Sequence, residues 1–213
     1  MAKPVKTRTY NSPVRREQAA RTRQRILESA ADLFVRQGYG TTSIREIAGA
    51  ARVAPDTVYA TFGTKARLLT ALLDIRLAPG GQTSILDRPE AQAIMKEPDP
   101  RQLLRLFARD YAAMSERVRP VSEVLRTAKA VEPEMATVRE QMEAHRFTYM
   151  RTFVQRLASR AKLRVPLNRA AQIVWTLASP DVGRMLCDVQ GWTTSQYADW
   201  LEDTLAATLL AAR

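Results

Sequence analysis

The hydrophobic positions of residues 43–69 follow helical spacing, interrupted by two short turns. In SIREIAGAARVAPDTVYATFGTK, four apolar residues recur every three or four positions and predict a short helix with one buried stripe. These residues are Ile44, Ile47, Ala48 and Ala51. Ser43 followed by Glu46 has the pattern of a capping box at its start. Pro55 suits the first position of a second helix, because its φ is fixed and it needs no N–H partner. The segment therefore predicts two short helices joined by a tight turn.

Two helices of this length need a third helix to pack against, since isolated helices below roughly 12–15 residues are marginal in water. Residues 16–37 supply that helix, and Gly38 is expected to end it in a left-handed conformation. The apolar positions at helical spacing are Ile26, Leu27, Ala30, Leu33 and Phe34. Three helices in this order predict a helix-turn-helix unit that binds duplex DNA. On pattern alone, a helical hairpin without a DNA role is the alternative.

The charge distribution favours the DNA-binding interpretation. Residues 1–76 hold 14 Lys and Arg against 6 Asp and Glu, a net of +8, whereas residues 77–213 are nearly balanced at 19 against 16. Neutralisation of phosphates supplies most non-specific DNA affinity, so a basic unit joined to a balanced one fits a DNA reader. Surface charge that only keeps the protein in solution is the alternative.

Residues 1–15 predict a disordered basic arm, because the first dozen are rich in Pro, Thr and Ser and lack apolar periodicity. Such an arm suits contact with phosphates or a minor groove. A terminus without a role fits the same pattern.

The motif has the pattern I47-A48-x-x-A51-x-V53-A54-x-x-T57-V58-Y59-x-x-F62-x-x-K65-x-x-L68-L69, preceded by G38-Y39-G40-T41-T42. This pattern resembles the DNA-binding domain of TetR-family transcriptional regulators. It implies an all-α fold, with a helix-turn-helix DNA-binding domain at 16–76 and a helical ligand-binding and dimerisation domain at 77–213. It also implies a homodimer, a double-stranded DNA operator and a small-molecule effector that relaxes DNA binding.

The motif and the resemblance together predict a set of DNA-contacting residues. They are Ser43, Arg45, Arg52, Pro55, Asp56, Thr57, Tyr59, Thr61 and Lys65. Tyr59 matches a tyrosine that reaches a phosphate, although a packing role is the alternative. The chain departs from the family pattern at Arg52, Ala54, Asp56 and Thr61. Because no Arg, Lys, Asn or Gln lies between Val53 and Gly63, the usual bidentate base contacts are absent from the second helix. We therefore expect base reading to shift toward Arg45 and Arg52.

Periodicity beyond the PGG turn at residues 79–81 predicts further helices. They span about 88–96, 100–117, 120–129, 133–162, 167–190 and 194–211. Pro180 is expected to kink or restart the fifth of these, with Ser179 as a cap. One group of residues predicts an apolar ligand pocket with polar handles, or alternatively a plain core: Phe107, Tyr111, Met114, Met142, His145, Tyr149 and Phe153. A second group predicts the dimer interface: Val174, Leu177, Trp200, Leu201 and Leu205.

Several classes of protein fit the chain poorly. No apolar run approaches 18 residues, and no apolar stretch follows the basic N-terminus, so we expect neither a membrane partner nor a signal peptide but a cytoplasmic protein. With one cysteine, Cys187, and one histidine, His145, we expect no metal and no cofactor. The chain lacks a Gly-rich phosphate loop and a telling carboxylate pair, which argues against an enzyme.

We expect a sequence-specific regulator, more specifically a repressor released by a small ligand; the alternative is a constitutive or architectural DNA-binding protein without a ligand.

Overall fold

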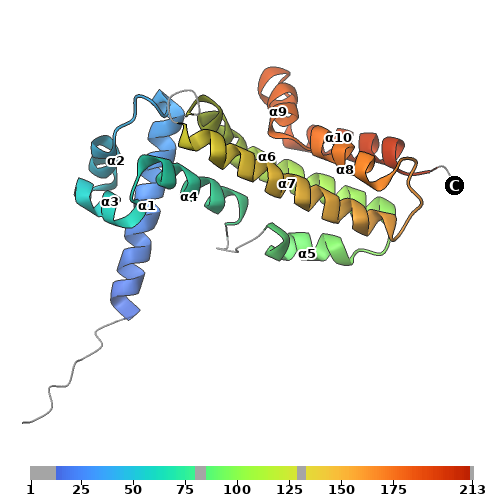
Figure 1. Ribbon diagram of the computed structural model, residues 1–213, viewed down its shortest axis with the longest axis horizontal. Coiled ribbons are helices and arrows are strands. Elements are labelled where there is room, and N and C mark those ends of the chain that lie inside the picture. Colours follow the sequence, from blue (N-terminus) through green and yellow to red (C-terminus); the bar gives the residue numbers. More distant parts are fainter. Residues whose placement is uncertain (1–12, 80–84, 129–132, 212–213) are drawn as a thin grey trace, which may run out of the picture.

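The computed structural model describes residues 13–79, 85–128 and 133–211, and the regular elements in these ranges are helices. One isolated β-bridge, between Leu163 and Leu210, is the exception in these ranges. The all-α prediction is therefore confirmed. The molecule is elongated, with the first four helices at one end and the remaining helices at the other (Figure 1).

The first four helices form the N-terminal unit. They are α1 (Pro13–Gln37), α2 (Ile44–Ala51), α3 (Pro55–Phe62) and α4 (Lys65–Leu77). The predicted stripe of α1 is buried except at Leu33, which is half-buried; Ile26 and Phe34 are 0% and 1% exposed. Gly38 ends the helix at φ 86°, as expected. The predicted arm at 1–15 is wrong for residues 13–15, which are helical because the charged sequence before Ile26 extends the helix past its core. The rest of the arm lies outside the described residues.

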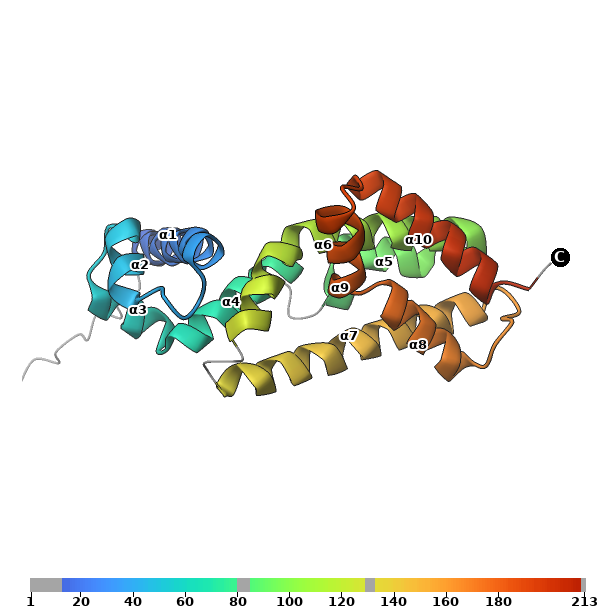
Figure 2. The ribbon, with the colours of Figure 1, turned by 90° about the horizontal axis from the view of Figure 1, so that it is seen from above.

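The second unit is a bundle in which α6 packs chiefly against α10 and α7 against α8 (Figure 2). Its elements are a 3-10 turn (Ile85–Asp87), α5 (Pro89–Lys96), α6 (Pro100–Ala128), α7 (Glu134–Ala158), α8 (Leu167–Leu177), α9 (Pro180–Gly183), a π-helical segment η2 (Arg184–Val189) and α10 (Thr194–Leu209). Ser179 caps α9 by accepting from the Val182 N–H at 3.2 Å, as the sequence indicated. The expected helix at 167–190 is instead interrupted after Leu177.

Helix α6 is one helix where two were predicted, at 100–117 and 120–129. A proline inside a helix removes a hydrogen bond and costs about 3 kcal/mol. Pro120 is tolerated because it is exposed, while Val118 and Val121 on either side are each buried. Packing of the flanking residues thus outweighs the local signal for a break.

Helix α6 contributes to two separate hydrophobic cores. Its residues up to Val118 belong to the core of the second unit. From Val121 onward its buried residues join the core of the N-terminal unit, together with Met135 of α7. The hydrophobic packing of the DNA-binding unit therefore includes segments far beyond residue 76, and the change of core falls at Pro120.

A buried ion pair joins the start of α5 to α6. Arg88 donates to both carboxylate oxygens of Asp110, at 3.0 and 2.6 Å, and the two side chains are only 3% and 12% exposed. Bidentate geometry of this kind fixes both partners, because both N–H groups and both oxygens must stay aligned. The Arg88 guanidinium is thereby held beside the aromatic side chains of the second core.

Candidate nucleic-acid interface

Helix α2 begins at the predicted capping box. The Ser43 hydroxyl accepts from the Glu46 N–H at 3.2 Å, and the Glu46 carboxylate accepts from the Ser43 N–H at 2.7 Å. These hydrogen bonds lower the pKa of Glu46, so the box is retained at neutral pH and is lost as the pH falls through the lowered value. With its start fixed, α2 leaves Arg45 exposed on the surface that faces away from the core.

The turn between α2 and α3 requires an unusual backbone at Arg52. Its φ of 55° and ψ of 50° are left-handed, and among the described residues it is the non-glycine residue with positive φ. Its N–H bonds the Gly49 carbonyl at 3.1 Å, and the next residue, Val53, is half-buried against the core. The left-handed region costs a residue with a Cβ roughly 1–2 kcal/mol. The chain bears this cost while placing an exposed arginine beside α3.

Helix α3 presents a polar outer surface. Pro55 occupies its first turn as predicted, and Val58 and Phe62 bury its inner side. Four of the predicted residues are exposed and Thr57 is half-buried; the exposed ones are Pro55, Asp56, Tyr59 and Thr61. Because the Tyr59 side chain is 52% exposed, its ring does not have the alternative packing role. Thr61 donates to the Thr57 carbonyl at 2.6 Å. The structure therefore leaves the predicted α3 residues exposed or half-buried around the outside of the helix, next to Arg45 and Arg52 in the chain.

Lys65 has contacts that the sequence did not predict. Its ammonium donates to the carbonyls of Tyr39 and Thr42, each at 3.0 Å, and lies 4.2 Å from the centre of the Tyr39 ring. Two of its three N–H groups are thus used to hold the start of α4 against the loop before α2. Thr64 caps α4 as expected, accepting from the Arg67 N–H at 3.1 Å. A phosphate contact by Lys65 stays a prediction, and the structure gives this residue a positioning role as well.

The predicted ligand pocket is a filled core in this structure. Phe107 stacks on Phe153 with ring centres 3.9 Å apart, and the rings of Tyr111 and Tyr149 lie 6.0 and 6.2 Å from Phe107. These four residues and Met114 are buried. Two other predicted residues do not join them. Met142 packs against the N-terminal core and His145 is exposed, because α7 turns their positions away from the aromatic cluster.

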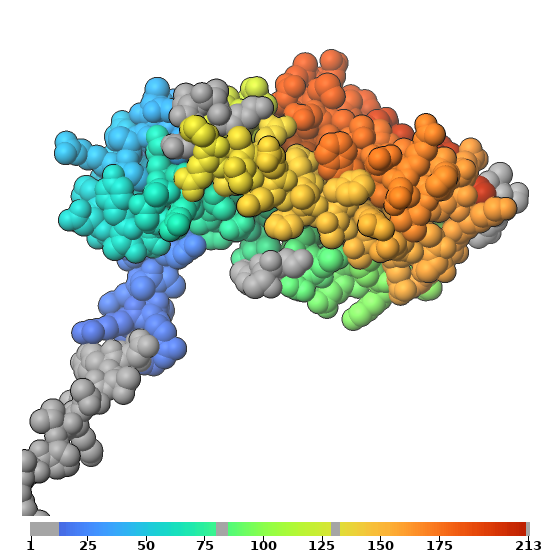
Figure 3. Space-filling view, viewed as in Figure 1, coloured from blue at the N-terminus to red at the C-terminus, as the bar shows by residue number. Residues whose placement is uncertain are grey.

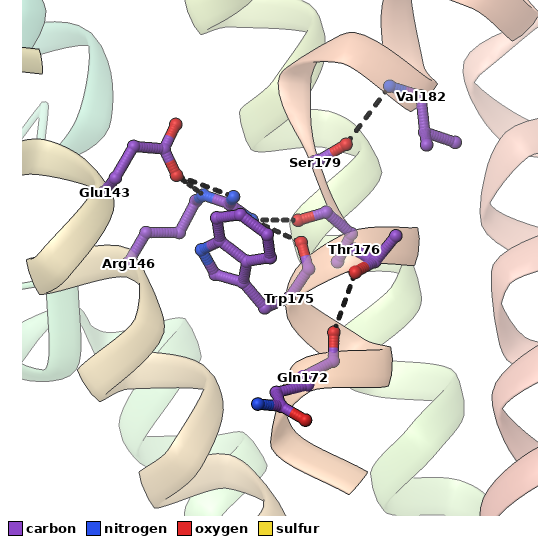
Figure 4. Close-up of polar contacts among 8 residues, drawn as sticks. Glu143, Arg146, Gln172, Trp175, Thr176, Ser179 and Val182 are labelled. Carbon is purple, nitrogen blue, oxygen red and sulfur yellow. Dashed lines mark hydrogen bonds and ion pairs between the residues drawn. The ribbon is translucent and has the colours of Figure 1, made fainter. Parts of the chain in front are cut away.

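Arg146, next to His145, holds the end of α8 (Figure 4). Its Nη1 donates to the carbonyls of Trp175 and Ala178 at 2.6 and 2.8 Å, and Glu143 pairs with the same guanidinium at 2.7 Å. The guanidinium also lies 4.4 Å from the centre of the Trp175 ring. The last carbonyls of a helix lack hydrogen-bond donors within the helix, and the Arg146 guanidinium is the donor for two of them here. The sequence carried no local signal for this contact, because the partners are about thirty residues apart in the chain.

Three of the five predicted dimer residues are buried within their own chain, so the predicted interface is not supported at these positions. Val174, Leu201 and Leu205 are each 0% exposed, since they face the core of their own chain and leave no surface for a partner. Leu177 and Trp200 are half-buried. The apolar side chains with most surface in this region are Met185 and Val189 of η2, at 48% and 62% exposure. Sequence reasoning missed them because the π-helical turn changes which positions face outward.

A groove of about 310 Å³ lies where α1, α4 and α6 meet, between the two units. It is lined by Ala31, Asp32, Val35, Arg36, Arg76, Glu116, Arg117, Pro120 and Val121. Elsewhere in the described ranges, no group of three His, Cys, Asp or Glu side chains is placed to hold a metal ion. No helix in those ranges is long and apolar enough to cross a membrane.

The first unit has the geometry of a helix-turn-helix DNA-binding domain: a capped α2, a tight turn, and an α3 whose polar side is exposed. Residues 26–72 match the family model described as bacterial regulatory proteins, tetR family. An HTH-type transcriptional repressor of Mycobacterium tuberculosis is 44% identical over 62 residues, which are 29% of this chain and 31% of that protein. The match thus spans about a third of that relative. Residues 26–72 therefore form a TetR-family DNA-binding domain.

Solved structures share the fold of the whole described chain. NalD, the secondary repressor of the MexAB-OprM multidrug efflux pump in Pseudomonas aeruginosa, has a TM-score of 0.69 at 20% identity, covering 92% of this chain and 100% of NalD. A transcriptional regulator from Saccharomonospora viridis in complex with choline has a TM-score of 0.68 at 17% identity, covering 91% and 100%. The second unit of this chain thus shares the helical fold of these proteins beyond their DNA-binding domains.

Arg52→Gly is expected to raise the free energy of unfolding by about 0.5–1 kcal/mol, because glycine adopts the left-handed conformation without a Cβ clash. The same change should weaken DNA binding if the exposed guanidinium contacts DNA. Urea unfolding and DNA titration of one preparation test both. A lower free energy of unfolding for Arg52→Gly would contradict the interpretation that the backbone is strained at this turn.

Proposed function

We propose that this chain is a sequence-specific transcriptional repressor that binds an operator as a homodimer and is released by a small-molecule ligand. The observation that carries the proposal is the exposed polar side of α3 beside Arg45 and Arg52, on a basic unit built like a TetR-family DNA-binding domain. The neighbours described as repressors support the direction of regulation. In this proposal the protein binds rather than catalyses, and it works in the cytoplasm with its DNA.

Base reading in this proposal is divided between the two motif helices. The α3 surface offers the Thr57 and Thr61 side chains for apolar contact with thymine methyl groups, and the Asp56 carboxylate as an acceptor for a cytosine amine. Neither type of contact matches the two hydrogen bonds that an arginine makes to guanine. Arg45 is therefore the proposed main reader, and Arg52 the second.

Selection of duplexes from a random library tests the function directly, and we expect a near-palindromic site. Arg45→Ala should lower affinity for that site by about 10- to 100-fold, the equivalent of about 1–3 kcal/mol, with little change on unrelated DNA. Titrations at several salt concentrations separate the two outcomes. An equal loss on all DNA would reassign Arg45 to phosphate contact, and sequence-blind retention by the wild type would contradict the regulator itself.

We place the effector at the aromatic cluster of α6 and α7. The Nε of Arg88 and the hydroxyl of Tyr149 are buried and make no hydrogen bond of good geometry with the described residues, although the Arg88 guanidinium lies close enough to the Tyr149 hydroxyl to act on it electrostatically. Burial raises the pKa of Tyr149, so its hydroxyl stays protonated and remains a donor. Buried donors without acceptors are costly, and a ligand oxygen would remove that cost.

The charge of Arg88 limits which ligand oxygen fits. Asp110 already neutralises its guanidinium through both oxygens. A second carboxylate there would leave an excess negative charge in apolar surroundings, which is expensive. The proposed effector is therefore an apolar molecule with a neutral acceptor, such as a ketone, ester or lactone carbonyl, whose body displaces the stacked Phe107 and Phe153.

Tyr149→Phe is expected to keep or raise the melting temperature without ligand, because it removes a buried hydroxyl that makes no hydrogen bond of good geometry. It should weaken a carbonyl ligand about tenfold. Thermal shifts with a panel of apolar ketones, esters and lactones, each beside its matching carboxylic acid, give both readouts. Tyr197→Phe is the matched control: its hydroxyl donates to the Leu177 carbonyl at 3.1 Å, so its loss should lower stability by about 1 kcal/mol and leave ligand affinity unchanged. Equal behaviour of the two variants would contradict this assignment.

The homodimer is proposed to form through the side of α8, η2 and α10 that keeps apolar surface. Leu177 and Trp200 contribute partly exposed side chains, and Met185 and Val189 contribute larger exposed ones. Exposed apolar side chains gathered near one end of a chain are typical of association surfaces. In Figure 1, α9, which leads into η2, lies near the middle of the molecule, and α8 and α10 extend from there away from α3, so pairing on this side leaves both α3 helices accessible.

The double variant Met185→Glu, Val189→Glu should remain folded and convert a dimer to a monomer, because charged side chains would be buried at the contact. Light scattering after gel filtration measures the mass. Val35→Glu, at a 52% exposed valine of α1, is the control and should leave the mass unchanged. A double variant that is still dimeric would move the interface elsewhere.

A constitutive DNA-binding protein without a ligand is the second candidate, and the closed packing of Phe107 on Phe153 favours it. Ligand panels distinguish the two, because a binder of the native state raises the melting temperature with concentration. A flat melting temperature across the panel, combined with selective DNA binding, would support the second candidate.

A further inference from the structure

Helix α1 extends well beyond the core that it helps to form. Its residues 13–21 are all exposed, and its N-terminal half projects away from the rest of the molecule (Figure 3). At 1.5 Å per residue, the part before Ile26 is about 20 Å long. This part carries five arginines against the single acid Glu17. A charged helical extension whose residues 13–21 are exposed is a candidate for contact with another molecule.

One side of this extension continues the side of α1 that faces the DNA-binding unit. Leu27, Ala30 and Phe34 form the buried stripe, and Arg23, Ala20 and Arg16 precede them at the same spacing of three and four residues. The direction of the stripe is fixed at Arg23, whose guanidinium lies 4.9 Å from the centre of the Phe62 ring in α3. Arg16 therefore lies on the side of α1 that meets α3, about 10 Å further out along the helix.

The other side of the extension has a different environment. Arg21 pairs with Glu17 at 2.7 Å, and Arg25 donates weakly to Thr22 at 3.5 Å. Arg25 is offset from Arg16 by nine residues, which puts it on the opposite side of the helix. The two arginines are both exposed and carry the same charge, but only one lies on the side of α3.

We infer that Arg16 contacts the phosphate backbone that flanks the site held by α3, so that α1 extends the footprint on duplex DNA. This inference rests on the proposed DNA-binding function. A major groove is about 12 Å wide, so a strand bordering a groove occupied by α3 falls within the span of the extension. An arginine suits this partner, because its planar fork matches phosphate oxygens. The contact adds affinity without reading sequence.

The experiment compares full-length Arg16→Ala and Arg25→Ala on the duplex that the wild type selects. Each phosphate contact contributes about 0.9 to the slope of log affinity against log salt. Arg16→Ala should lower the magnitude of that slope by about 0.9 for each copy bound. When the salt is raised from 50 to 200 mM, the affinity of the variant should therefore fall less than that of the wild type, by a factor of about three to four per copy. Arg25→Ala should keep the wild-type slope. Alanine preserves helix propensity at both positions, and circular dichroism verifies the fold.

A second duplex, trimmed to the selected site without its flanks, locates the contact. The difference between Arg16→Ala and the wild type should disappear on it. Equal slopes for all three proteins on the long duplex would overturn the inference, because Arg16 would then be a solvated charge. Equal decreases of the slope in both variants would also overturn it, because they would show a general effect of net charge. A change in the preferred flanking sequence would also overturn it, in favour of base contact. Failure of the wild type to select any site would contradict the proposed function instead, so the two failures are distinguishable.

Discussion

The structure depends on the N-terminal hydrophobic core, which α1 to α4 share with the end of α6, because neither helix of the DNA-binding motif is stable alone. Helices α2 and α3 have eight residues each, well below the length at which a helix is stable in water. Burial of Ile47, Val58 and Phe62 against α1 and α4 provides the stabilisation that propensity does not. The same core takes in the last turns of α6, so the geometry of the DNA-reading side depends on a helix that begins in the other unit.

This arrangement gives a physical route between the two units. Helix α6 is buried in one core up to Val118 and in the other from Val121, and Pro120 between them lacks the N–H that would bond the preceding turn. A groove opens at this point between α1, α4 and α6. A change of packing around Phe107 would therefore act on the position of α4 and α1 through a single helix. Coupling of this kind requires only that the two arrangements differ in ligand affinity.

Signals within a few residues of one another predicted local structure well. The Ser43–Glu46 capping box, the Pro55 start, the Gly38 end and the Ser179 cap are all confirmed, because each involves groups that are neighbours in the chain. The apolar stripe of α1 is confirmed for the same reason. The candidate DNA-contacting residues on α3 were also predictable, since the inward positions of a short amphipathic helix define its outward ones.

Contacts between distant segments were not predictable from spacing. The periodicity that identified Val174, Leu201 and Leu205 as apolar could not say whether they face their own core or a second chain, and all three face their own core. Lys65 was predicted only as a DNA contact, and its carbonyl partners Tyr39 and Thr42 lie 26 and 23 residues away in the chain. Arg88 was not identified as a candidate, and its partner Asp110 lies 22 residues away. Pro120 gave a strong local signal for a break that packing overrode. The burial of a residue depends on the whole fold, so local spacing in a single sequence does not predict which apolar residues face their own core.

The composition of α3 shapes how specificity can arise on this scaffold. A recognition helix without Arg, Lys, Asn or Gln has few side chains that make paired hydrogen bonds to bases. In the proposed interface, Thr57 and Thr61 would contribute apolar contacts that discriminate weakly, while the arginines of α1 and α2 would contribute charge. Affinity would then come mainly from phosphates, and discrimination from a few arginines and from the cost of fitting DNA to a rigid surface. That division requires the angle between α1, α2 and α3 to be well fixed, which the Arg23–Phe62 contact and the two carbonyls that hold Lys65 provide.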